Sequence, residues 1–286
     1  MLGRFLLPEL QWSTPASFEA PSILLDFDAV VELQWFATVF APPGLRNRLV
    51  PNQRYYESFE DSRAEGPTAL GRHFADGLSS RSILCRSWGF DADDRFIALR
   101  IRSRAHCGEP YIVVSNGADR PWPVVGRQTK QLPRDLFSEI IRATMARLPD
   151  LRFVEVGIDR DSPSIAGTRD LRAATTLADL LELLYGASAV ACIEGGMAHL
   201  CAALGKPALV MIGPTSEVNY GHRLHTYIRS GLCSPCAWSR IDWYATCIKN
   251  LQAACMSAFD PARVAEAIAA IVPGGSETVL REPATL

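Results

Sequence analysis

The residues from Glu194 to His199 have types and spacing that could do chemistry in this 286-residue chain. They read Glu-Gly-Gly-Met-Ala-His and follow the apolar run "AVACI". Two glycines let the backbone approach an anion closely, and a helix beginning near Met197 would offer its free N–H groups to a diphosphate. His199 would add a donor, whereas Glu194 suits sugar hydroxyls or the N–H groups of the helix itself. A ligand with both phosphate and hydroxyl groups fits best; a plain strand-to-helix turn is the alternative.

A cysteine group lies further along the chain. The spacing C-x2-C-x10-C-x7-C belongs to Cys233, Cys236, Cys247 and Cys255. It is typical of a tetrahedral thiolate site for zinc or iron, which would fix a loop too small to have its own core. Four buried or free thiols are the alternative. A nucleic-acid-binding finger is disfavoured, because the loop carries only Arg240 and Lys249 as basic residues.

Alternating strand and helix patterns must position these groups. Helical or β-rich periodicity predicts strands over "YIVVSNG", "LRFVEVGID", "AVACI" and "ALVMI", and helices over "LPRDLFSEIIRATMARLPD", "TTLADLLELLYGAS", "GMAHLCAAL" and "DPARVAEAIAAIV". Thr176 and Asp260 are the expected N-caps of the second and fourth of these helices. Such alternation favours a parallel, doubly wound sheet, in which ligands bind beyond the carboxyl ends of the strands.

The first hundred residues are less regular. One or two strands are expected in "SILLDFDAVVELQWF", a helix in "GPTALGRHFADGLSSRSILCRSWG" and a strand at "FIALRI". The polar hinge "RSRAHCGEP" follows, and we place a domain boundary there, between residues 1–107 and residues 108–286.

Composition narrows the class of partner. The 29 basic and 31 acidic residues nearly cancel, so the sequence shows no electrostatic footprint for nucleic acid or an anionic membrane, and a small-molecule partner is favoured. The opening "MLGRFLLPELQW" lacks the long apolar core of a signal peptide, and no apolar run is long enough to cross a bilayer. We therefore expect a cytoplasmic protein without a transmembrane segment, whose eight cysteines are thiols or metal ligands.

Taken in order, these segments resemble glycosyltransferase family 9. The resemblance is carried by Lys130 in "TKQLP", by "GID" after a strand, by "TTLADLLELLYGASAVACIEGGMAHLCAALGKPALVMIGPT" and by the cysteine loop before "CMSAFDPARVAEAI", and it covers roughly Tyr111 to Val272. This family contains the ADP-heptose heptosyltransferases, and the autotransporter heptosyltransferases are similar to it. The resemblance implies an α/β fold of the GT-B type with two Rossmann-like domains. A shortened acceptor domain would cover residues 1–107, and a nucleotide-sugar domain would cover residues 108–286.

The resemblance also implies an activity and a set of residues. A heptose-like sugar would pass from an ADP-sugar donor to a glycan or protein hydroxyl with inversion. Lys130 would neutralise the donor diphosphate and Asp159 would hold the ribose, while Leu132 replaces a family tryptophan. Gly213-Pro214-Thr215 would face the donor from the next strand. The family motif D-[ST]-G-x-x-H is matched, with Glu for Asp, by Glu194, Gly195, Gly196 and His199. No divalent metal is expected at the donor, whereas similar cysteine loops bind iron in autotransporter heptosyltransferases.

The N-terminal half departs from the family pattern. The family's opening strand and "G-D" loop, which supplies a catalytic Asp, has no counterpart here, and "DAVVELQW" looks like a later family strand. The catalytic residue is unknown, with Asp26, Asp28 and Glu32 as candidates because they lie in or beside early strands. Two alternatives stay open: a catalytically silent or partner-dependent nucleotide-sugar-binding protein, and a metal-finger interaction protein. The chain could act as a homo-oligomer or with a partner subunit.

Overall fold

The computed structural model describes much of the C-terminal half of the chain and separate stretches before it. The described residues are 30–33, 37–40, 74, 77–87, 99, 109–117, 129–158, 160, 162–233, 235–237, 239 and 243–272. The backbone alone is described at 30–33, 37–40, 84 and 87.

Strands and helices alternate along most of the described chain. In chain order the elements are β1 (Val30–Leu33), β2 (Ala37–Phe40), α4 (Ser80–Ser87), β3 (Tyr111–Ser115), α5 (Arg134–Arg147), β4 (Arg152–Glu155), β5 (Arg169–Asp170), α6 (Leu177–Gly186), β6 (Ala189–Ile193), α7 (Gly196–Ala203), β7 (Ala208–Met211), α8 (Glu217–Tyr220), β8 (Thr226–Ile228), α9 (Ala254–Ser257) and α10 (Pro261–Ile271).

The main sheet has six parallel strands in the order β5-β4-β3-β6-β7-β8. The chain starts at the centre with β3, runs to one edge through β4 and β5, and then crosses back to β6 and on to the other edge. Val113 pairs with Val154 on one side and with Val190 on the other. This is the order of a doubly wound Rossmann sheet, so the predicted parallel sheet is confirmed for this part of the chain.

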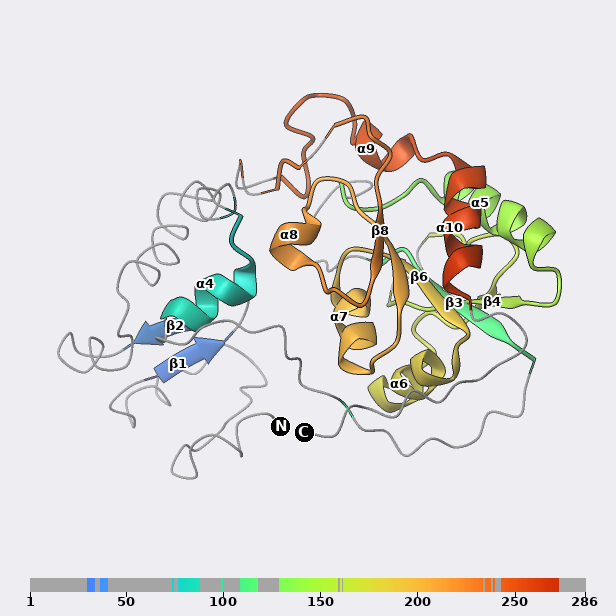
Figure 1. The fold of residues 1–286 in the computed structure, drawn as a ribbon, viewed down its shortest axis with the longest axis horizontal. Helices are drawn as coiled ribbons and strands as arrows, with labels where there is room; N and C mark the ends of the chain where they lie inside the picture. Colours follow the sequence, from blue (N-terminus) through green and yellow to red (C-terminus); the bar gives the residue numbers. More distant parts are fainter. Residues whose placement is uncertain are drawn as a thin grey trace.

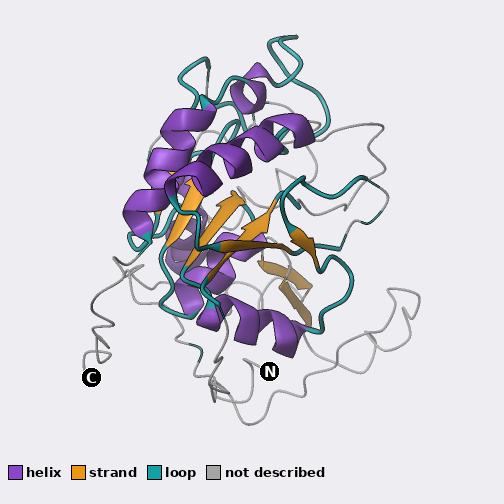
Figure 2. Ribbon diagram, turned by 90° about the vertical axis from the view of Figure 1, so that its right-hand side faces the viewer, coloured by secondary structure: helices purple, strands orange, loops and turns teal. Residues whose placement is uncertain are grey.

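Helices cover both faces of the sheet (Figures 1 and 2). The strands are buried on both sides, which explains their nearly continuous apolar sequences. Alternate residues serve the two faces: Ala191 and Ile193 of β6 pack in the core beneath α5 and α10, whereas Val190 and Cys192 pack in the core beneath α6 and α7. Cys201 of α7 is buried in the second core.

Capping residues fix where two helices begin. Thr176 and Asp179 form a capping box at the start of α6, and the Asp260 carboxylate accepts from the N–H of Ala262 at the start of α10. Pro261 occupies the first turn of α10, where its missing N–H costs nothing. Both N-caps confirm the sequence prediction.

Less of the N-terminal part is described. β1 and β2 form an antiparallel pair, and α4 provides the expected helix. Helix α4 lies beside α8 (Figure 1), and Asn219 donates to the carbonyl of Leu78 at 2.9 Å. Apart from Leu99, whose N–H bonds Ala203 at 2.7 Å, the predicted strand "FIALRI" lies outside the described residues. Most of residues 1–107 also lies outside them, so the two-domain division stays a prediction.

A membrane-spanning helix was not expected. In the stretches that the structure describes, none of the helices combines the length and apolar character needed to cross a bilayer.

Candidate functional site

The candidate site lies where the strand order reverses. β3 and β6 are neighbours, but the chain leaves them toward opposite edges of the sheet, so the loops that follow them diverge. Such a switch point, at the carboxyl ends of the strands, is where open α/β sheets bind ligands. Asn116 follows β3, and Glu194 follows β6.

Lys130 and Glu194 meet at this point. The Lys130 Nζ lies 2.7 Å from the Glu194 Oε2, and both side chains are largely buried, with exposed fractions of 15% and 7%. The sequence suggested sugar hydroxyls or helix N–H groups as partners of Glu194. The structure instead pairs it with the predicted diphosphate lysine, so the two predicted residues lie together.

Asn116 holds the loop that carries Lys130. Its side-chain amide donates to the carbonyl of Leu132 at 2.9 Å, and its side-chain oxygen accepts from the N–H of Leu132 at 3.0 Å. Gln131 also donates to the carbonyl of Asn116 at 3.3 Å. The two buried hydrogen bonds between the Asn116 side chain and the Leu132 backbone keep the loop at the end of β3. No role was predicted for Asn116, although Asn-Gly ends the predicted strand "YIVVSNG".

Trp243 supports the same loop from far along the chain. The Thr129 hydroxyl donates to the carbonyl of Trp243 at 2.9 Å, and the Thr129 N–H bonds the carbonyl of Tyr244 at 2.9 Å. The Lys130 Nζ lies 6.0 Å from the centre of the Trp243 ring, within cation–π range. Leu132, two residues after Lys130, is buried in the core, whereas the Trp243 ring lies beside the Lys130 ammonium group.

Gly195 and Gly196 open the turn between β6 and α7. A Cβ built on either glycine has no atom within 4 Å, so space lies above this part of the backbone. Helix α7 begins at Gly196, close to the predicted start, and no side chain caps its N-terminus. His199 occupies its first turn, and His199 Nδ1 lies 2.6 Å from His222 Nε2. The turn therefore offers backbone donors and an imidazole together.

The Gly213-Pro214-Thr215 turn ends the next strand, β7. Arg229 holds it by donating to the carbonyls of Gly213 at 3.3 Å and Thr215 at 3.1 Å, while pairing with Glu217. The Thr215 hydroxyl is buried and finds no hydrogen-bond partner among the described residues. A buried hydroxyl left unbonded is unfavourable, so a ligand group here would relieve that cost.

The predicted ribose residue, Asp159, lies outside the described residues, but the segment after it is firmly held. Buried Glu155 pairs with Arg134 at 2.8 Å and with Arg172 at 3.5 Å, and it accepts from the N–H of Ile165 at 2.7 Å. Arg172 also donates to the carbonyl of Ser162 at 2.9 Å. These bonds tie the segment between β4 and β5 to the end of β4.

The four cysteines of the predicted metal site gather in one region. Burial raises the pKa of Cys255 to about 12, with the nearby Cys233 and Cys236 thiols adding to the shift, and Cys255 hydrogen bonds with Cys233. Burial also raises the pKa of Cys236, with added effects of Cys233 and Cys247. Within the described stretches, however, no three His, Cys, Asp or Glu side chains are arranged to hold a metal ion.

Cys247 differs from the other thiols. Burial raises the pKa of Cys247. Hydrogen bonds from the backbone N–H groups of Ala253, Leu251 and Lys249 lower it by more, so the net shift is downward. Asn250, Gln252 and Ala253 have positive φ, a conformation that turns successive N–H groups toward one point. This backbone nest favours a thiolate, the form of cysteine that binds metals.

The cysteine loop is bonded to the switch-point side of the molecule. The N–H groups of Cys236 and Ala237 both donate to the carbonyl of Pro214 at 2.8 Å. Gly213 packs so closely on the loop that a Cβ there would lie 2.3 Å from the sulfur of Met256. Through Trp243 the same loop also supports Lys130. The loop therefore braces both sides of the candidate site.

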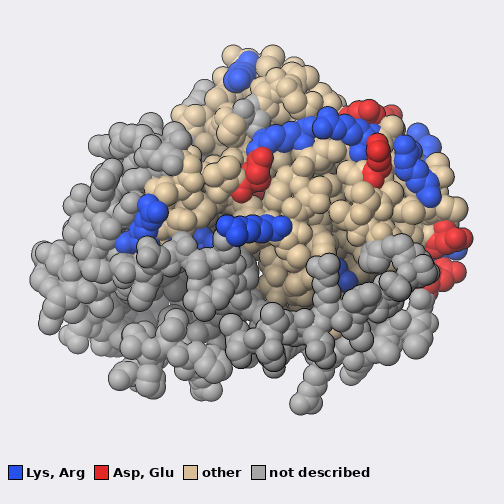
Figure 3. Space-filling view, in the orientation of Figure 1, with Lys and Arg blue, Asp and Glu red and all other residues tan. Residues whose placement is uncertain are grey.

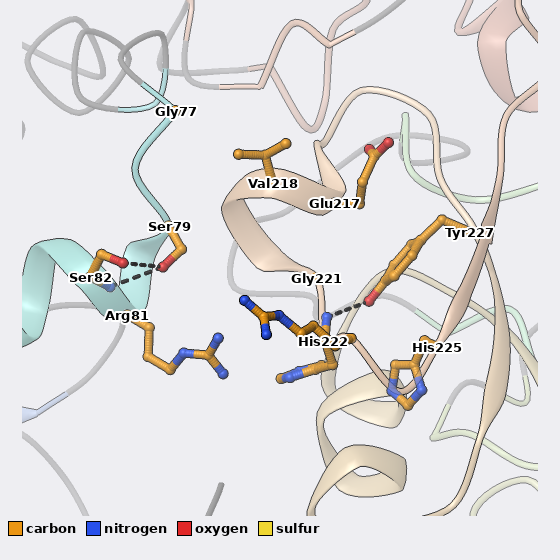
Figure 4. A pocket seen from close by; sticks show the side chains of 11 residues that line it. Gly77, Ser79, Arg81, Ser82, Glu217, Val218, Gly221, His222, His225 and Tyr227 are labelled. Carbon is orange, nitrogen blue, oxygen red and sulfur yellow. Dashed lines mark hydrogen bonds between the residues drawn. The ribbon is translucent and has the colours of Figure 1, made fainter. Parts of the chain in front are cut away.

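A pocket of about 440 Å³ lies between α4 and the segment from α8 to β8 (Figure 4). Ser79, Arg81 and Ser82 line it from α4 and the residues before it. The other wall includes Glu217, Val218, Gly221, His222, Arg223, His225 and Tyr227. Because His222 also bonds His199, the pocket adjoins the turn at the start of α7. This pocket was not predicted, because its walls lie far apart in the chain.

Basic and acidic side chains are interspersed on the described surface (Figure 3). On the described part of the face in Figure 3, basic side chains lie next to acidic ones and do not form a one-sign field. This matches the near-balance of 29 basic and 31 acidic residues.

Comparisons place these observations among known proteins. Residues 87–237 match the model of glycosyltransferase family 9 (heptosyltransferase). No curated protein sequence matches the chain. The iron-containing, dodecameric heptosyltransferase TibC in complex with ADP-D-beta-D-heptose has a similar structure over 68% of this chain, with 17% identity and a TM-score of 0.57. A second TibC structure, from enterotoxigenic E. coli H10407, also matches over 68%, with 16% identity and a TM-score of 0.56.

The structural matches cover only part of those proteins. They span 53% and 54% of the two TibC chains. At these identities they support a shared fold for the described α/β sheet. Any inference about the activity of this chain must therefore come from its family and from its own residues.

Proposed function

The chain belongs to glycosyltransferase family 9, and from that membership we propose that it transfers a heptose-like sugar from an ADP-sugar to an acceptor hydroxyl. The observation that carries the proposal is the Lys130–Glu194 pair at the switch point of the sheet. A cation and a carboxylate beside an open glycine turn provide for both halves of a nucleotide-sugar: its phosphates and its hydroxyls.

The leaving diphosphate needs stabilisation as the glycosidic bond breaks. Lys130 would turn from Glu194 to the phosphates and neutralise their growing charge. Backbone N–H groups at the start of α7 and a ring N–H of His199 would donate from the other side. These groups can act without a divalent metal at the donor, because they already supply positive charge and aligned donors.

Glu194 would then bind the sugar. Once Lys130 moves to the phosphates, the buried carboxylate needs new donors, and paired sugar hydroxyls provide them. Thr215 adds a hydroxyl that has no partner among the described residues. Glu194 thus couples the arrival of the diphosphate to the recognition of the sugar.

We place the acceptor in the pocket between α4 and the α8–β8 segment. A hydroxyl bound there could attack the sugar from the side opposite the diphosphate, which gives inversion at the reacting carbon. The catalytic base is not assigned. Asp26 and Asp28 lie outside the described residues, and of Glu32 the structure describes only the backbone, in β1.

The nucleotide site is tested by calorimetric titration with ADP, UDP and GDP. We expect ADP to bind best and Gly196→Ala to weaken it about tenfold, because the new methyl group would fill the open space above the turn. The folded state should keep its free energy of unfolding, since alanine is a better helix residue than glycine. Equal affinity in wild type and Gly196→Ala would contradict a phosphate position over this turn, and a wild type that binds no nucleotide would overturn the donor proposal.

The cysteine loop would hold a structural zinc or iron ion. All four candidate ligands lie in one region, and the nest around Cys247 favours its thiolate, whereas burial raises the pKa of Cys236 and Cys255, whose thiolates the ion itself would have to stabilise. Cys233, Cys236, Cys247 and Cys255 would hold the ion, which would stabilise the loop.

The metal is tested by elemental analysis of the purified protein. We expect about one zinc or iron ion per chain in wild type and a loss of most of it in Cys236→Ser. Cys85→Ser is the matched control, because Cys85 lies on α4 and should leave the metal content unchanged. Full metal content in Cys236→Ser, or none in wild type, would refute the four-cysteine site.

A second candidate is a nucleotide-sugar-binding protein that is silent or needs a partner for catalysis. It is favoured by the described site, where Lys130, Glu194 and the start of α7 account for donor binding without a catalytic base. Single-turnover assays with ADP-heptose separate the two. Donor consumption would favour the transferase, whereas tight ADP binding without consumption would favour the binding protein.

A further inference from the structure

Three histidines, His199, His222 and His225, lie together at the start of α7, although a donor for an anion there would need only His199. His199 Nδ1 lies 2.6 Å from His222 Nε2, and their rings meet nearly at right angles. His225 packs against His222 with ring centres 5.4 Å apart, and its Nε2 lies 2.7 Å from the carbonyl of Ala198. Three imidazoles from separate positions in the chain therefore surround the first turn of α7.

The contacts restrict how these rings carry protons. A carbonyl can only accept, so His225 must present a protonated Nε2 to Ala198. Between His199 and His222, one of the two facing nitrogens must donate and the other must accept. Burial, followed by the nearby His199, His225 and Arg81, lowers the pKa of His222 to about 3, so its ring is neutral at pH 7.

The backbone and Tyr227 fix the position of His222. The Tyr227 hydroxyl accepts from the backbone N–H of His222 at 2.7 Å, as Figure 4 shows. His222 is itself 7% exposed. The backbone bond and the burial thus restrict where the His222 imidazole can lie.

We propose that His222 is a positioning residue that donates its Nε2–H to His199 Nδ1 and so keeps His199 in the tautomer protonated at Nε2. An anion at the start of α7 needs a donor, and this tautomer leaves His199 Nε2–H to serve it. The reverse arrangement would leave Nε2 of a neutral His199 without a hydrogen and repel a phosphate oxygen. The role rests on the proposed diphosphate site, but the tautomer can be measured without a nucleotide.

The first test is the tautomer itself, measured by long-range ¹H–¹⁵N spectra of the full chain. In wild type we expect His199 Nδ1 to be unprotonated and Nε2 protonated. His222→Gln should keep this state, because the glutamine amide can donate from a similar place, whereas His222→Phe should give a mixture. A protonated Nδ1 in wild type, or an unchanged tautomer in His222→Phe, would overturn the proposal.

The second test is the affinity for ADP. We expect His222→Phe to bind ADP about tenfold more weakly and His222→Gln to stay within about threefold of wild type. Because His222 acts through His199, the double variant His199→Ala/His222→Phe should bind no more weakly than His199→Ala. Additive losses would contradict the positioning role. If wild type binds no ADP, the donor proposal fails while the spectra still decide the tautomer.

Discussion

Replacing Lys130 with alanine should weaken ADP binding by about 100-fold, the largest effect expected at the candidate site. A charge-assisted hydrogen bond to phosphate is worth about 1.5–3 kcal/mol, and the largely buried position of Lys130 places this one near the upper end. The dissociation constant is measured by calorimetry for wild type and variant under the same salt conditions.

The variant also removes the partner of a buried carboxylate, which needs its own control. Glu194 would be left without its cation, at a cost of about 3 kcal/mol in the free energy of unfolding. Lys130→Ala/Glu194→Gln should recover much of that stability without recovering ADP affinity. Lys206→Met is the matched lysine control: its ammonium group donates to the carbonyl of Ala187 at the amino ends of the strands, far from the switch point. Near-normal ADP affinity in the stable double variant would refute the role of Lys130.

Replacing Glu155 with glutamine should lower the free energy of unfolding by about 3–5 kcal/mol. The Glu155 side chain is 1% exposed, and its carboxylate pairs with Arg134 and Arg172 while accepting from the N–H of Ile165. The neutral amide would remove the carboxylate partner of Arg134 and leave the buried Arg172 paired with Asp170, while Glu155 itself sits where water barely reaches. Urea unfolding followed by fluorescence measures the change.

A surface ion pair supplies the comparison. Glu109 lies 2.9 Å from Arg152, but both side chains are more than half exposed. Glu109→Gln should therefore change the free energy of unfolding by less than about 1 kcal/mol. Similar effects of the two substitutions would show that burial does not set the value of the Glu155 network.

The regular elements were predictable because local signals agree with the final packing. The apolar runs that became β3, β4, β6 and β7 are short and bounded by turn residues, and the caps at Thr176 and Asp260 fix two helix starts. β5, α8, β8 and α9 were not predicted. They have two to four residues each, too few for a periodic pattern, and are held by neighbours distant in sequence.

Motifs pointed to the members of the candidate site but not to their contacts. Lys130, Glu194 and His199 were identified from motifs, yet their partners depend on the order of the strands and on loops that meet in space. Thr129 and Trp243 lie 114 positions apart, a separation over which no local pattern operates. Asp159 stays a prediction.

The double hydrogen bond to Pro214 links the order of the cysteine loop to that of the β7 turn. Because Cys236 and Ala237 share a single carbonyl acceptor on that turn, local unfolding of the loop would break both bonds and leave the turn held by Arg229. Thermodynamic linkage is reciprocal: if an ordered loop raises the affinity of the turn for a ligand by some factor, the bound ligand stabilises the ordered loop by the same factor. Protection of the Cys236 and Ala237 amides from hydrogen exchange would then rise with occupancy of the neighbouring site.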